Sequence, residues 1–149
     1  MNKKDMHDLL SSYYDNKGSI LPAIDEYESI NSIIYSLNAA MMADKVSSGS
    51  TNDKLEKALI LMELRAQNVL DNVVRYTETA DEIERLVGKV RDVKSSYGAI
   101  LEQYYIDGKT HAEIGESIHY SEDYVGDLKQ NALGVAVDIV EGEADGIAS

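Results

Sequence analysis

The segment THAEIGESIHYSEDYVGDLKQNAL, residues 110–133, sets the organisation expected for the rest of the chain. Thr110 and Glu113 have the spacing of a capping box, which predicts a short helix ending near Ile118. Ser121 is then suited to cap a longer helix that starts at Glu122. Six apolar residues recur at helical spacing and are expected to face inward: Ile114, Ile118, Val125, Leu128, Ala132 and Leu133. A short helix, a tight turn and a longer helix are therefore predicted.

Helices are also expected on the N-terminal side of this segment. Residues 97–106 read as one helix ended by Asp107-Gly108-Lys109, in which Gly108 suits a left-handed backbone position. A first helix over residues 3–14 is expected to stop at the turn formers 15–19. Pro22 would then occupy the first turn of a second helix, which lasts until about Asp44.

The middle of the chain predicts a helical hairpin. Residues 45–52 form the clearest loop, with Asn52 as an N-cap for the next helix. That helix has apolar residues at heptad spacing: Leu55, Leu59, Met62, Ala66, Val69 and Val73. A separate helix is expected from Thr77 or Thr79, because Thr79 and Glu82 have capping-box spacing. It would carry the apolar stripe Ile83, Leu86, Val87 and Val90.

The fold class that follows is all-α, a coiled-coil-like N-terminal hairpin followed by a C-terminal helix-turn-helix. No segment has the pattern of a strand. Residues 1–94 form the hairpin and oligomerisation region, 95–140 the helix-turn-helix module, and 141–149 an acidic tail that is expected to fray.

Composition limits the partners and the chemistry. The chain has 27 Asp and Glu against 14 Lys and Arg, a net charge of −13, and no cysteine. A charge of this sign favours basic partners and disfavours anionic membranes, and the absence of cysteine excludes disulfides and Cys-based zinc sites. No apolar run approaches the roughly 20 residues of a membrane-spanning helix, and no signal-peptide pattern is seen, so a cytoplasmic protein is expected.

The motif core of residues 110–133 resembles region 4 of sigma factors and the related C-terminal domains of phage late-gene transcription regulators. The resemblance covers roughly residues 97–137. The hairpin followed by this module is also similar to small proteins in phages of Gram-positive bacteria. What the resemblance implies is sequence-specific binding of double-stranded DNA, often as a dimer, and control of late genes in the host cell.

By position in the motif, the resemblance implies that one side of the last helix contacts DNA or a protein partner: Ser121, Glu122, Tyr124, Gly126, Asp127, Gln130 and Asn131. Such modules commonly carry arginine or lysine where this chain has Glu122 and Asp127. Carboxylates can accept a hydrogen bond from cytosine, but phosphates repel them. Glu122 and Asp123 also have a purely structural role available, since acidic residues stabilise a helix N-terminus.

Basic residues cluster just before the helix-turn-helix module. Residues 85–94 hold four cations that could contact phosphates: Arg85, Lys89, Arg91 and Lys94. The alternative is a solvent-exposed helix face on which these cations balance the negative charge of Asp81, Glu82 and Glu84. From residue 96 to 149 only Lys109 and Lys129 stand against eleven acidic residues.

Enzymatic chemistry is not expected. His111 and His119 lack the spacing of a metal-binding pair, and no phosphate loop, dinucleotide fingerprint or nucleophile elbow occurs. The sequence therefore predicts a non-enzymatic protein without metal or cofactor.

Three functions remain open. The first is a DNA-binding transcription regulator that dimerises through the hairpin. The second is an acidic interaction protein, which would mimic DNA and inhibit a DNA-binding host protein, such as a CRISPR effector, or bind RNA polymerase. The third is a structural component of a helical assembly, which the heptad spacing supports.

Overall fold

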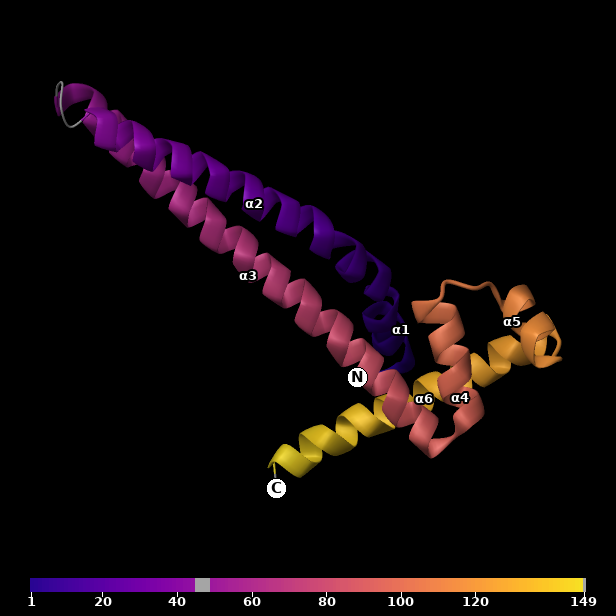
Figure 1. Cartoon of the computed structure of the whole chain (residues 1–149). Helices are drawn as coiled ribbons and strands as arrows, with labels where there is room; N and C mark the ends of the chain where they lie inside the picture. The colour runs from indigo at the N-terminus through magenta and orange to yellow at the C-terminus, as the bar shows by residue number, and fades with distance from the viewer. Residues whose placement is uncertain (45–48, 149) are drawn as a thin grey trace. The chain divides into compact units, whose positions relative to one another are not determined.

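The computed structural model describes residues 1–44 and 49–148. These residues form α1 (Lys3–Ser11), α2 (Tyr13–Asp44), α3 (Gly49–Val93), α4 (Ser95–Leu101), a π-helical turn (Glu102–Ile106), α5 (His111–Ile118) and α6 (Glu122–Ala148) (Figure 1). No strand occurs in this part of the chain, so the all-helical prediction is confirmed.

The chain divides into two compact units. Residues 1–17 and 78–149 form one, which we call the terminal unit, and residues 18–77 form the other, the α2–α3 unit. Residues 78–94, which the sequence groups with the hairpin, therefore belong to the terminal unit.

The core of the terminal unit is built from both ends of the chain. Side chains of α1, α3, α4 and α6 meet in one cluster that includes Met6, Leu10, Ile83, Val90, Leu101 and Leu133, each no more than 1% exposed. A second cluster joins α4, α5 and α6 through Ile100, Ile114, Val125 and Leu128. Five of the six predicted inward positions are buried, and the sixth, Ile118, is partly buried against this cluster.

Within the α2–α3 unit the two helices lie side by side (Figure 1). Ile30 of α2 is buried with Ala66 and Val69 of α3, and Arg65 forms an ion pair with Glu26 between the helices. Ala66 and Val69 belong to the predicted heptad pattern, and Met62 is partly buried against them. The second helix is described as far as Asp44, its predicted end, and the residues that follow, 45–48, lie outside the described part of the chain.

The predicted turn at residues 15–19 is wrong, because these residues are helical. The chain is interrupted at Ser12 instead, and the Asn16 N–H donates to the Ser12 carbonyl at 3.0 Å. Tyr13 is buried in the core and its hydroxyl donates to Glu84 at 2.6 Å. The helix propensities of these turn formers are unfavourable by no more than about 1 kcal/mol per residue, and tertiary contacts of this kind override them.

Pro22 lies inside α2 rather than in its first turn, so that prediction is also wrong. A proline here leaves the carbonyl of Gly18 without its helical donor. Gly18 is exposed, so water can satisfy that carbonyl and the helix continues.

Two predicted helix starts are wrong as well. The helix begins at Gly49, so Asn52 lies inside it and is not a cap, while residues 45–48 lie outside the described part of the chain. No new helix starts at Thr77 or Thr79, because α3 continues to Val93. The Thr77 hydroxyl donates to the Val73 carbonyl at 2.8 Å, which is how a threonine is accommodated within a helix.

The helical segment before Asp107 ends at Ile106, as predicted. Gly108 has φ of 73°, and the Asp107 N–H donates to the Glu102 carbonyl at 2.9 Å, the wide closure of a π turn. The acidic tail is part of α6, which extends to Ala148, and the N-terminal ammonium of Met1 pairs with Glu141 at 2.9 Å. Ser149 lies outside the described residues.

Candidate nucleic-acid or partner interface

The turn between α5 and α6 is closely defined by its sequence. Thr110 and Glu113 form the predicted capping box, in which the Thr110 hydroxyl accepts from the Glu113 N–H at 3.2 Å. His119 ends α5 in the left-handed region with φ of 63°. Gly115 is required here, since an added Cβ would lie 2.4 Å from the Tyr120 carbonyl oxygen. The Ser121 hydroxyl then accepts from the Tyr124 N–H at 3.2 Å, as predicted for a cap of α6.

One side of α6 is buried and the other side is exposed. The buried side includes Val125, Leu128 and Ala132. Six of the seven predicted contact residues are exposed: Ser121, Glu122, Tyr124, Asp127, Gln130 and Asn131. The structure therefore brings these residues together along the first half of one helix. Gly126 is the exception, because it is half-buried with the His111 ring 3.8 Å from where its Cβ would be.

The exposed side of α6 is acidic along its length. Besides Glu122 and Asp127, the exposed residues include Asp123, Asp138 and Glu141. A surface of this charge repels phosphates and attracts cationic groups. Since Glu122 and Asp123 lie in the first turn, they also stabilise the positive end of the helix dipole.

An aromatic pair stands at the start of this surface. Tyr120 and Tyr124 meet edge to face with ring centroids 4.7 Å apart, and they remain 48% and 45% exposed. Sequence reasoning singled out Tyr124 but missed Tyr120. Tyr120 could have been identified from the sequence, because it lies four positions before Tyr124 across the turn. Exposed tyrosines are common anchors in protein interfaces.

The cations of residues 85–94 are exposed, but three of them already have partners. Lys89 pairs with Glu143, and Arg91 pairs with Glu102. The Lys94 ammonium lies 4.5 Å from the centre of the Tyr97 ring. Carboxylates of the terminal unit therefore compensate two of the four positive charges of this segment. Arg85 is exposed and lines a groove with Lys89 and Glu143.

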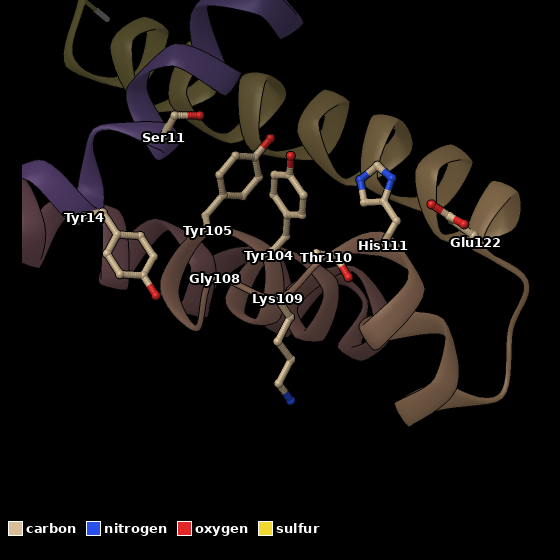
Figure 2. A pocket seen from close by; sticks show the side chains of 9 residues that line it. All are labelled: Ser11, Tyr14, Tyr104, Tyr105, Gly108, Lys109, Thr110, His111 and Glu122. Atoms are coloured by element: carbon tan, nitrogen blue, oxygen red, sulfur yellow. The ribbon is translucent and has the colours of Figure 1, made fainter.

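A pocket of about 470 Å³ lies between the π turn, the loop at Gly108 and the beginning of α6. Figure 2 shows the rings of Tyr105, Tyr104 and His111 in a row along it, with Lys109 extending away from them. Neighbouring ring centroids in this row are 4.8 and 5.0 Å apart. The row joins the module to α1, because the Tyr105 hydroxyl lies 2.7 Å from Nδ1 of His7.

His111 occupies an unusual position in this pocket. Its Nε2 atom is buried and has no hydrogen-bond partner in the described structure. Burial lowers the pKa of His111, and the Lys129 ammonium lowers it further, while Glu122 acts in the opposite direction. The imidazole is therefore held in its neutral form. A neutral ring packed against the Tyr104 phenol can stack and form hydrogen bonds.

No group of three metal-ligating side chains occurs among the described residues, and no helix there has an apolar stretch long enough to span a bilayer. No known family model, curated protein or solved structure matches this chain.

Proposed function

We propose that this chain is a phage-type transcription regulator that uses α5 and α6 as a sigma region 4-like helix-turn-helix. One observation supports the proposal most. The predicted contact residues Ser121, Glu122, Tyr124, Asp127, Gln130 and Asn131 all project from the exposed side of a helix whose other side is fixed in a core. A reading helix requires this combination of a rigid support and an exposed polar surface.

In this mechanism Gln130 and Asn131 supply the base contacts. Both are exposed amides, and amides pair with adenine through two hydrogen bonds in the major groove. Glu122 and Asp127 would restrict binding to sites where a cytosine amino group faces them. The acidic surface thus limits affinity, so a single module would bind DNA weakly.

Dimerisation would supply the missing affinity, because two modules can engage two half-sites. The α2–α3 unit is the proposed dimer contact. Its α3 surface exposes three large apolar side chains within little more than one turn, Ile60, Leu61 and Leu64, each more than half exposed. Water-exposed apolar clusters of this kind commonly mark protein interfaces.

Selection of genomic DNA fragments at low salt tests the proposal. We expect a defined sequence to be enriched, and the Gln130→Ala and Asn131→Ala variants to lose or change that preference. Ser95→Ala changes an exposed polar residue of α4, outside both the α6 surface and the proposed dimer contact, and is the control that should select the same sequence as the unaltered protein. Failure to enrich any sequence would count against DNA recognition.

A second function is favoured by the carboxylates on α6. The same surface could imitate the phosphates of DNA and bind the basic cleft of a nuclease or of RNA polymerase, with electrostatic attraction increasing the association rate. The exposed tyrosines, Tyr120 and Tyr124, would then anchor the protein contact.

Neutralising Glu122 and Asp127 separates the two functions, because it changes binding in opposite directions. The Glu122→Gln and Asp127→Asn double variant should bind DNA more tightly if α6 enters a groove, since it removes repulsion from phosphates. The same variant should bind a basic protein partner less tightly if α6 imitates DNA. Fluorescence anisotropy with duplex DNA, and capture of purified polymerase or nuclease, would measure the two effects.

A further inference from the structure

A second, smaller pocket of the terminal unit contrasts with the charge of the protein as a whole. It has a volume of about 340 Å³ and lies between α1 and α6. Its lining consists of Lys3, Lys4, His7, Lys129, Gln130 and Leu133, with no carboxylate. In a chain with 27 acidic and 14 basic residues, a pocket with three lysines and no acid is unexpected.

Lys129 makes this pocket more than a group of surface lysines. It is only 7% exposed and is the one charged residue in the described structure that is buried. Its ammonium lies 4.2 Å from the centre of the Tyr104 ring. No carboxylate of the described residues forms an ion pair with it. Desolvating an ammonium without an anionic partner is costly, and burial accordingly lowers the pKa of Lys129.

The neighbouring groups hold the pocket in shape and leave its positive charge uncompensated. The side chain of Lys3 lies along α6, with its Cε atom 3.2 Å from where a Cβ of Gly134 would be. His7 is fixed by the Tyr105 hydroxyl. Of the nearby acids, Asp5 accepts the Asn2 N–H at 3.2 Å and Glu141 pairs with the Met1 ammonium.

We propose that this pocket binds a phosphate group, held by the ammonium groups of Lys3, Lys4 and Lys129 and by the amide of Gln130. A phosphate carries close to two negative charges and several acceptor oxygens, so it gains more from three ammonium groups than a single carboxylate does. Bound phosphate would give Lys129 the anionic partner that the protein itself does not provide. Gln130 also belongs to the proposed DNA-reading surface, but phosphate binding by the three lysines does not depend on sequence-specific recognition of DNA.

Titration with inorganic phosphate at constant ionic strength tests the proposal. We expect saturable shifts of the backbone amide NMR signals of residues 3–7 and 129–134, and much weaker binding of acetate. Lys129→Met replaces the buried aliphatic part of the side chain by one of similar length and removes the charged ammonium, and should weaken phosphate binding by about tenfold or more. Lys4→Met should also weaken binding, and it keeps the test valid if the buried substitution disturbs the fold.

Lys17→Met is the matched control, because it removes one exposed lysine of the same unit outside the pocket. The proposal is overturned if phosphate causes no saturable shift, if acetate binds as well, or if Lys129→Met and Lys17→Met behave alike. The source of the phosphate is found by adding duplex DNA. Displacement of inorganic phosphate would identify a backbone phosphate, whereas unchanged binding would identify a separate phosphate ligand.

Discussion

The two units of this protein bury their apolar residues to very different extents. In the terminal unit, Met6, Leu10, Leu101 and Ile114 are fully buried. In the α2–α3 unit, the buried cluster consists of Ile30, Ala66 and Val69, while large apolar side chains such as Leu21, Tyr35, Met42, Leu61 and Leu64 are at least 60% exposed. The terminal unit therefore has an extended apolar core, whereas the α2–α3 unit leaves much of its apolar surface exposed to water.

Matched leucine substitutions should show this contrast most strongly. Leu101→Ala removes a fully buried side chain and should lower the free energy of unfolding by about 2–5 kcal/mol. Leu64 is 60% exposed, so Leu64→Ala should cost less than about 0.5 kcal/mol in the monomer. Urea unfolding followed by circular dichroism measures both.

A large, concentration-dependent cost of Leu64→Ala would change the comparison. It would indicate that a second copy covers α3, as proposed for the dimer. Equal and concentration-independent costs of both leucine variants would contradict the contrast between the units.

Glycine substitutions should give effects of opposite sign in the two units. In the terminal unit, Gly115→Ala pushes a Cβ against a backbone carbonyl and should cost about 1–3 kcal/mol. An added Cβ at Gly18, in the α2–α3 unit, meets nothing within 4 Å, so Gly18→Ala should stabilise the helix by about 0.5–1 kcal/mol. Thermal unfolding would measure both changes, and a stabilising Gly115→Ala would show that the turn before α6 is looser than described.

The hydroxyl groups of two tyrosines, one in each unit, should also differ in their contribution to stability. Tyr13 donates to Glu84 and is 6% exposed, so Tyr13→Phe should cost about 1 kcal/mol. Tyr35 is 78% exposed, and Tyr35→Phe should have no measurable effect.

The contribution of Tyr13 should also depend on pH. Burial, together with Glu84, raises the pKa of Tyr13 to about 12. A raised pKa in the folded state means that the stabilisation is present below about pH 10 and is lost as the pH rises toward 12. Unfolding of the wild type and Tyr13→Phe at pH 8 and pH 11 checks this, and a difference that stays constant between them would contradict it.

The smallest effect should come from His111. Its pKa is lowered in the folded protein, so the unfolded chain binds the proton more readily. Stability should therefore be complete above about pH 6.5 and should fall as the pH decreases below that value. His111→Phe keeps a ring beside Tyr104 and should reduce the loss of stability between pH 7.5 and pH 5.5. An identical pH dependence in the variant would show that the imidazole is not shielded.

Local signals in the sequence were sufficient for the module that contains α5 and α6. The caps at Thr110 and Ser121, the left-handed Gly108 and the inward positions of α6 were predicted, because each depends on residues close in sequence. Exposure of the predicted contact residues followed from the same periodicity.

Features that depend on tertiary contacts could not be predicted. Residues 15–19 carry strong turn formers, yet they are helical beside a core that holds Tyr13. The lysine pocket was missed for the same reason, because Lys3, Lys4 and Lys129 lie at opposite ends of the chain and only the contact of α1 with α6 brings them together.

The π turn at Glu102–Ile106 couples two contacts that lie far apart in the sequence. Tyr104 of this turn has the centre of its ring 4.2 Å from the Lys129 ammonium, and the hydroxyl of the next residue, Tyr105, lies 2.7 Å from Nδ1 of His7. One short segment therefore supports both the buried lysine of α6 and the position of α1. A change in the backbone of this turn would disturb the two ends of the terminal unit together.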